Sequence, residues 1–256
     1  MISFARRCAV ALVLLAGALV AWGAPTAEER AFNSARLAFQ NEFWARAERE
    51  FATFIEKFPA SEHRAGALLY QAEARYYRTN YAGAAALLES GRANAGPLAD
   101  EYIFWLAQAR REEGKLEPAA GLFAQVPRDF PASTRALESV VMEAVVRTQL
   151  KQWPRVTELL QSPEGLFQKA TAANPATGWG LRGRMLLAGG LLEQGRFADA
   201  EGALELLVKA PLEGATAWER DHLLARIRMA GGRLEAALDA TANLATAATN
   251  KPALVA

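Results

Sequence analysis

The sequence has 256 residues but only one cysteine and two histidines, and it has no runs that alternate Val, Ile and Thr. One cysteine cannot form a disulfide within the chain, and so few Cys and His residues disfavour a structural zinc site. The missing alternation disfavours strands, whereas abundant Ala and Leu favour helices. We therefore predict an all-α protein that is stabilised by side-chain packing alone.

An excess of charge of either sign is also missing. The chain has 29 Lys and Arg residues against 28 Asp and Glu residues, which gives a net charge of +1. A chain without a surplus of positive charge has no general field to attract nucleic acid or an acidic membrane. The composition therefore favours a soluble helical protein.

The first residues have a composition of their own. Arg6 and Arg7 precede an apolar stretch at 8–22, and small residues follow its core. A basic start before a short apolar run is typical of a secretory signal peptide, so we predict cleavage after Gly23. An uncleaved anchor is the alternative, although this run is shorter than the roughly 20 residues that span a bilayer. Arg7 stands directly before Cys8, which disfavours lipid attachment. We therefore expect an exported, periplasmic chain without a lipid.

The remaining residues, 24–256, repeat one pattern six times. In each unit a small residue is followed nine positions later by a bulky one, and Ala or Val follows three positions after that. The small residues are Ala35, Ala72, Ala107, Ala144, Ala188 and Ala225. The bulky residues are Trp44, Tyr81, Leu116, Trp153, Phe197 and Leu234. Small residues let two antiparallel helices approach closely, and a bulky residue fills the wedge near their turn. The pattern therefore predicts six helical hairpins.

The spacing of the units locates their boundaries. Successive units are 37, 35, 37, 44 and 37 residues apart, so the long interval predicts an insertion, which we place at 162–178. Short turns are expected at Thr79-Asn80, Glu113-Gly114 and Gln194-Gly195, and Pro59, Pro131 and Pro211 are expected to end second helices. Gly and Asn suit the left-handed residue that ends a helix, and proline stops one.

Local signals predict where several helices begin. Thr26 with Glu29, and Thr216 with Glu219, have the spacing of capping boxes. Ser61 and Ser133 each follow Pro-Ala, so we interpret them as helix caps and not as nucleophiles.

The first unit, AFNSARLAFQNEFWARAEREFATFIEKFP, resembles the tetratricopeptide repeat, and the resemblance extends over 27–250. The fourth unit departs from the pattern at Val156 and the sixth at Thr241. The resemblance implies an α-solenoid, a right-handed superhelix of about six hairpins, whose first helices line a concave groove. The motif FPAS, at 58–61 and 130–133, is similar to bacterial envelope repeat proteins of the Tol-Pal coordinator and outer-membrane assembly type.

The resemblance also implies which side chains face the groove. The candidates, taken from the first three units, are Phe32, Arg36, Leu69, Glu73, Tyr77, Phe104 and Gln108. Regularly placed Lys and Asn residues that would clamp a terminal carboxylate are missing. An extended or helical protein segment with apolar anchors is therefore the expected ligand.

Nothing in the sequence predicts catalysis or a cofactor. A literal G-x-G-x-x-G at 178–183 has no preceding strand, so we interpret it as a flexible loop that enters the fifth hairpin. His63 and His222, each expected at the start of a first helix, lie far apart and have no metal-ligand spacing. We predict no metal, no cofactor and no enzymatic activity.

Three functions remain open. The chain is expected to be an interaction scaffold of the cell envelope, a self-assembling structural module, or a regulatory region that serves a separate enzyme. The last unit has no obvious polar capping helix. Either Thr241, Asn243 and Thr246 make that helix polar enough, or this end docks on a partner or on another copy.

Overall fold

The computed structural model describes residues 25–173 and 178–241, and within these ranges every regular element is a helix. The α-helices are α2 (Ala27–Gln40), α3 (Trp44–Lys57), α4 (Arg64–Tyr77), α5 (Tyr81–Gly91), α6 (Ala99–Glu112), α7 (Leu116–Asp129), α8 (Ala136–Gln149), α9 (Trp153–Gln161), α10 (Leu166–Thr171), α11 (Gly178–Glu193), α12 (Phe197–Val208) and α13 (Gly214–Ala230). Two short 3₁₀ turns, η2 (Arg92–Asn94) and η3 (Gly96–Leu98), precede α6, and 234–241 is also helical.

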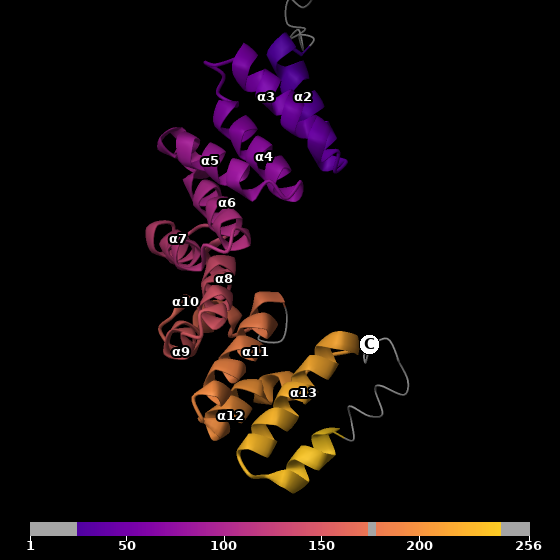
Figure 1. The fold of residues 1–256 in the computed structure, drawn as a ribbon, viewed down its shortest axis with the longest axis vertical. Coiled ribbons are helices and arrows are strands. Elements are labelled where there is room, and N and C mark those ends of the chain that lie inside the picture. The colour runs from indigo at the N-terminus through magenta and orange to yellow at the C-terminus, as the bar shows by residue number, and fades with distance from the viewer. Residues whose placement is uncertain (1–24, 174–177, 242–256) are drawn as a thin grey trace, which may run out of the picture.

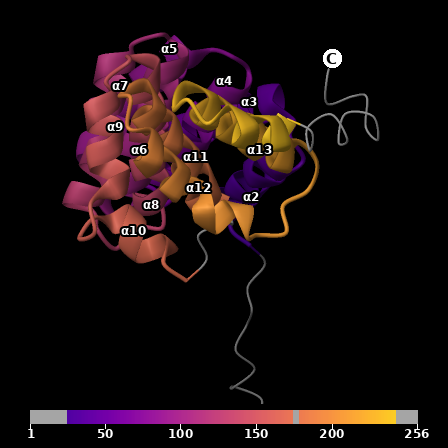
Figure 2. The same ribbon diagram turned by 90° about the horizontal axis from the view of Figure 1, so that it is seen from below.

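These helices stack in sequence order into an arc. Figure 1 shows the arc running from α2 to α13, with both of these helices on its open side. In both views the second helices α5, α7 and α9 lie on the outside, and α6 and α8 lie within (Figure 2). The all-α solenoid that the repeats predict is therefore confirmed.

The six units form the six predicted hairpins. All six predicted small residues are buried, and each predicted bulky residue is the first residue of a second helix. Ala47, Ala84, Ala119, Val156, Ala200 and Ala237, which stand three positions after the bulky residues, are buried as well. Small side chains at both positions let the paired helices approach closely.

The turn inside each hairpin has one geometry. The residue two positions before each bulky residue has a positive φ; these residues are Glu42, Thr79, Gly114, Lys151, Gly195 and Gly232. The next residue then donates its N–H to a carbonyl five positions back, as in the 2.9 Å bond from Asn80 to Arg75. This is the Schellman closure of a helix. In the second turn Thr79 is the left-handed residue and Asn80 caps α5, so the expected role of Asn80 was wrong.

The prolines and one capping box are as predicted. Pro59, Pro131 and Pro211 follow the ends of α3, α7 and α12. Thr26 and Glu29 form both bonds of a capping box.

The second predicted capping box was wrong. The helix α13 begins at Gly214, so Thr216 lies inside it and does not open it. As a further consequence His222 lies in the middle of α13 and not at its start, whereas His63 is the N-cap of α4 as expected.

The N-caps of α4 and α8 are His63 and Arg135, and neither helix has a side-chain cap, so the predicted capping role of Ser61 and Ser133 was wrong. The hydroxyl of Ser61 accepts the N–H of His63, and that of Ser133 accepts the N–H of Arg135, both at 3.0 Å. Each hydroxyl also donates to a carboxylate in the first turn of the preceding first helix, Ser133 to Asp100 at 2.5 Å. Each FPAS motif therefore ties two successive units together.

The predicted insertion contains α10. Its Phe167 is buried against α11, where a Cβ at Gly183 would lie 2.1 Å from the Phe167 ring. Residues 178–183 form the first turns of α11, so the expected flexible loop was wrong. No strand precedes them within the described residues, and Gly183 is required by close packing and not by a phosphate.

The predicted signal peptide at 1–23 and the end of the last unit, with Asn243 and Thr246, lie outside the described residues. Among the helices described, none combines the length and the hydropathy needed to cross a membrane.

Candidate partner-binding groove

A cavity of about 690 Å³ lies on the inner side of the arc, between the first helices of the last three units. It is lined by Thr148, Trp153, Leu181, Arg182, Met185, Leu186, Gly189, Gly190, Leu192, Glu193, Thr216, Glu219, His222, Leu223 and Arg226. Most of these residues belong to α11 and α13, which run along the lower part of the arc in Figure 1. We call this cavity the C-terminal groove.

Two adjacent glycines of α11 border the groove for different reasons. A Cβ on Gly190 would lie 3.3 Å from Val156, so close packing against α9 favours a glycine there. A Cβ on Gly189 would meet nothing within 4 Å. A glycine inside a helix costs about 1 kcal/mol relative to alanine, and no neighbour of Gly189 explains that cost. Its effect is to leave space in the groove.

The rim of the groove carries charges of both signs. Arg226 of α13 faces Glu193 of α11 at 3.7 Å, and Arg182 and Glu219 add an exposed charge on each side. The imidazole of His222 stacks on Trp218, with ring centroids 5.0 Å apart. An apolar floor with a charged rim is typical of a protein–protein interface.

Several residues of the C-terminal groove stand at the same positions, relative to the small residue of their unit, as the predicted groove residues of the first units. Met185 and His222 stand three positions before a small residue, as Phe32 does, and Gly189 stands one position after, as Glu73 does. The sequence interpretation missed them because the register was applied only to the first three units. The same register carried on to Ala188 and Ala225 would have found them.

Two of the predicted groove residues belong to the core. Phe104 is 1% exposed and packs edge-on against Phe123, while the guanidinium of Arg135 covers its ring at 4.5 Å. Leu69 is buried too. Neither side chain is accessible to a partner.

The other predicted residues of the first unit have some exposed surface. Arg36 is exposed, and Phe32 is half-buried with its ring stacked on His63 at 4.6 Å. No contact joins either of them to the C-terminal groove. They remain candidates at the opposite end of the arc.

Glu73 and Tyr77 lie near aromatic rings of three units, and Gln108 follows one of these rings, Trp105, by three positions on α6. The ring of Tyr77, which is 45% exposed, stacks on Trp44 at 4.3 Å and meets Trp105 at 5.8 Å. Burial raises the pKa of Glu73 to about 8, the charge of Glu101 adds to this shift, and Arg135 opposes it. We call Trp44, Glu73, Tyr77, Trp105 and Gln108 the aromatic-acidic patch.

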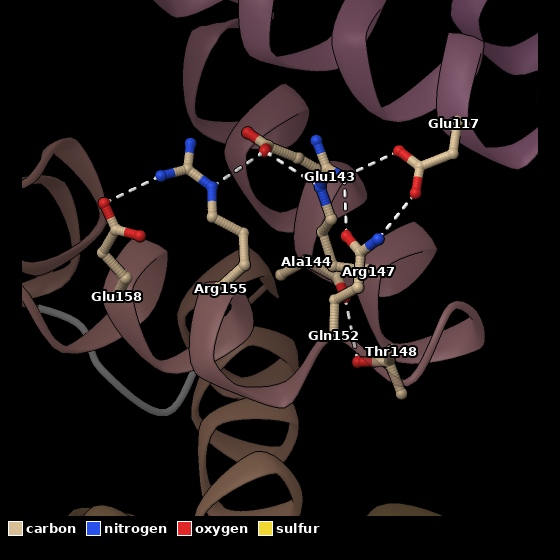
Figure 3. Close-up of polar contacts among 8 residues, drawn as sticks. All are labelled: Glu117, Glu143, Ala144, Arg147, Thr148, Gln152, Arg155 and Glu158. Atoms are coloured by element: carbon tan, nitrogen blue, oxygen red, sulfur yellow. Dashed lines mark hydrogen bonds and ion pairs between the residues drawn. The ribbon is translucent and has the colours of Figure 1, made fainter.

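A buried carboxylate on α8 has a different role. Glu143 is 2% exposed, and Figure 3 shows it between Arg147 and Arg155, at 3.4 Å and 3.3 Å. Burial raises its pKa, against the influence of both arginines. Arg147 also forms an ion pair with Glu117 of α7 at 2.9 Å. Because Arg147 and Arg155 both donate to its Oε1, Glu143 serves as a structural link between α8 and α9, and Arg147 extends this link to α7.

The described part of the chain contains no group of three His, Cys, Asp or Glu side chains that is suited to a metal ion. His63 and His222 lie at opposite ends of the arc, each stacked on an aromatic ring.

Comparison with known proteins supports the fold. No protein-family model and no curated protein matches the sequence. Among solved structures, a tetratricopeptide repeat protein from Parabacteroides merdae is similar, with a TM-score of 0.52 and 14% identity over 89% of this chain and 95% of that one. BtubC (BKLC) from P. vanneervenii has a TM-score of 0.59 at 16% identity, over 89% of this chain and 94% of that one. MamA MSR-1 has a TM-score of 0.56 at 18% identity, over 74% and 99%.

These similarities concern the fold. The chain is a helical-repeat solenoid, and within that class its fold is tetratricopeptide-like.

Proposed function

We propose that this chain is a non-catalytic protein–protein interaction scaffold of the bacterial cell envelope, which holds a segment of a partner in its concave groove. The observation that carries the proposal is the C-terminal groove of about 690 Å³ between α11 and α13. A cavity of this size accommodates several side chains of an extended or helical segment.

The composition of the groove supports an apolar anchor on that segment. Leu181, Met185 and Leu223 supply an aliphatic lining, and Gly189 leaves open space above it. A bulky apolar side chain in this space would bury its surface at about 25 cal/mol per Å². The charges of Arg182 and Glu219 at the rim would orient the segment.

The envelope assignment rests on two features of the sequence. Arg6 and Arg7 before the apolar stretch at 8–22 have the form of an export signal. The FPAS motifs resemble the Tol-Pal coordinator type of envelope repeat protein. N-terminal sequencing of the protein from its native cell tests the assignment. We expect a periplasmic chain that begins at Ala24, and an intact, cytosolic N-terminus would overturn it.

Photo-crosslinking in the native cell tests groove binding. A photoreactive amino acid is placed at Met185, inside the groove, and separately at Glu205, which is exposed on α12. We expect Met185 to crosslink one or a few envelope proteins and Glu205 to crosslink none of them.

A blocked groove provides the control. Gly189→Trp fills the open space and should abolish the Met185 crosslinks, whereas Gly189→Ala should preserve them. Equal thermal melts of the two variants would show that the fold is intact. Crosslinks that persist in the Gly189→Trp variant would overturn the proposal.

Two exposed leucines in the second helix of the last unit favour self-assembly as a second candidate function. Leu234 and Leu238 stand four positions apart on the helical segment 234–241 and are 63% and 68% exposed. Light scattering over a range of concentrations decides between the two. A persistent monomer excludes self-assembly, and a concentration-dependent oligomer that dissociates in Leu238→Glu establishes it. The third candidate, a regulatory region, predicts that the Met185 crosslinks lead to an enzyme.

A further inference from the structure

The aromatic-acidic patch has unused capacity for hydrogen bonds. The carboxyl of Glu73 is half-buried, and no hydrogen bond to it is found within the described residues. The indole Nε1 of Trp105 and the Oε1 of Gln108 are also buried without a partner. A buried polar group without a partner costs about 1–3 kcal/mol, so the two on α6 call for a functional explanation.

The charges around Glu73 are negative on balance. Arg135 is the cation that faces it, and this arginine is already bound to Glu101 at 3.0 Å and to Glu138 at 2.8 Å. Glu42 adds a further negative charge near Tyr77. The guanidinium of Arg135, which is already paired, therefore lies among several carboxylates. A further positive charge would be favourable in the patch.

The aromatic rings favour the same kind of ligand. Tyr77 is held between Trp44 and Trp105 and keeps almost half of its surface exposed. Tyr77 and Glu73 stand one helical turn apart on α4, so the phenol ring and the carboxyl lie on one face. Trp and Tyr rings attract a cation through the negative potential of their faces, and more strongly when the cation is desolvated.

We propose that the aromatic-acidic patch binds a cationic side chain, a guanidinium or an ammonium, of the partner segment. The carboxylate of Glu73 accepts its N–H groups, and the exposed ring of Tyr77 supplies the aromatic face. This inference rests on the proposed function, in which the partner is a protein segment. It places a second anchor at a distance from the C-terminal groove and specifies its chemistry.

Two peptides that differ only in charge test the proposal. The first is Ala-Ala-Arg-Ala-Ala, acetylated and amidated at its ends, and the second has neutral citrulline in place of arginine. Each is titrated into the purified protein, and the NMR signal of the Trp105 indole N–H, assigned with Trp105→Phe, is followed. We expect the arginine peptide to shift this signal and to bind at least about tenfold more tightly than the citrulline peptide.

Substitutions at Glu73 and at a distant acid complete the test. Glu73→Gln should bring the two peptides to equal affinity, while Glu158→Gln, an exposed acid on α9, should leave the preference unchanged. The Glu73→Gln protein should still unfold in a single cooperative transition, which would show that its fold is intact. Equal affinity of the two peptides for the unmodified protein would overturn the proposal, and so would a preference that survives Glu73→Gln.

The pH dependence provides a second readout. Because a bound cation stabilises the ionised carboxyl, the arginine peptide should lose affinity by up to about tenfold per pH unit below pH 8, and the citrulline peptide should not. Glu101, Arg135 and Tyr77 lie near Glu73 and remain in both titrations. These experiments do not involve the C-terminal groove, so their failure is distinguishable from loss of the Met185 crosslinks.

Discussion

Arg75 on α4 donates a hydrogen bond of 2.9 Å to Glu48 on α3, and this ion pair joins the first two hairpins. The arrangement recurs, because in three other units an arginine three positions after the small residue pairs with a glutamate of the preceding second helix. These pairs are Arg110–Glu89 at 2.5 Å, Arg147–Glu117 at 2.9 Å and Arg228–Glu201 at 2.8 Å. The fifth unit has the buried Leu191 there, after the α10 insertion.

Removal of these arginines should affect stability unequally. Arg147 also pairs with the buried Glu143, so Arg147→Met should destabilise by about 3 kcal/mol. Arg75→Met breaks a partly exposed pair and should cost about 1 kcal/mol. Urea unfolding measures both. Arg128→Met is the control, because Arg128 is exposed and pairs only with its neighbour Asp129. Equal midpoints for the Arg147 and Arg128 variants would contradict this ranking.

Replacing Thr79 with glycine should stabilise the folded protein. Its φ of 61° lies in the left-handed region, which costs a β-branched residue about 1–2 kcal/mol. The greater freedom of glycine in the unfolded chain offsets part of the gain, so Thr79→Gly should stabilise by about 0.5–1 kcal/mol. Thermal melts measure the change. The reverse substitution at the equivalent turn position, Gly114→Ala, should lower the melting temperature, and a rise there would refute the argument.

Larger side chains at the interface between the two helices of a hairpin should destabilise the folded protein. Ala47 and Ala119 are fully buried between paired helices, so Ala47→Leu and Ala119→Leu should each cost about 1–3 kcal/mol through overpacking. The control is Ala45→Leu, on the exposed face of α3. We expect no loss for Ala45→Leu in thermal melts. Neutral results at both buried sites would contradict the assigned register.

Two glycines of α11 should respond in opposite directions to the same substitution. Gly183→Ala would force its Cβ into the buried ring of Phe167 and should destabilise by about 1–3 kcal/mol. In Gly189→Ala the new methyl group would lie in open space, so the substitution should stabilise the folded protein by up to about 1 kcal/mol through helix propensity. Denaturant midpoints of the two variants check the prediction. A loss at Gly189 would show that the groove is not open there.

Glu73 should make stability depend on pH. Burial raises the pKa of its carboxyl from 4.5 to about 8, so the folded state binds this proton more tightly than the unfolded state does. The contribution is fully present below about pH 4.5 and is lost as pH rises through 8. Glu73→Gln removes this titration, so its melting temperature relative to the unmodified protein should be higher at about pH 9 than at about pH 4.

Glu201 serves as a control, because its pKa is shifted in the direction opposite to that of Glu73. Burial works against ionisation there, but hydrogen bonds from Arg228 and Arg233 hold the pKa of Glu201 below its usual value. Its contribution is present above the unfolded pKa and is lost as pH falls through the lowered one. Glu201→Gln should therefore reduce the melting temperature at neutral pH and have little effect in acid. The same pH trend for both variants would contradict the assignment of Glu73.

The amino-acid sequence by itself determined the hairpins and their register. A small residue such as Ala72, nine positions before a bulky one such as Tyr81, reports contacts within one hairpin, and such short-range contacts leave a regular trace in the sequence. The arginines at the positions of Arg75 and Arg147 left a trace as well, although their partners in the preceding unit were visible only in the structure.

Only the tertiary structure decided which inner side chains are accessible. Phe104 and Tyr77 were both predicted groove residues, yet the next unit buries Phe104 and leaves Tyr77 exposed. The structure also showed that Gly183 packs on Phe167 while Gly189 opens into the C-terminal groove. The physical reason is that accessibility depends on how successive hairpins are rotated against each other. Contacts between units set that rotation, and a pattern within one unit does not contain it.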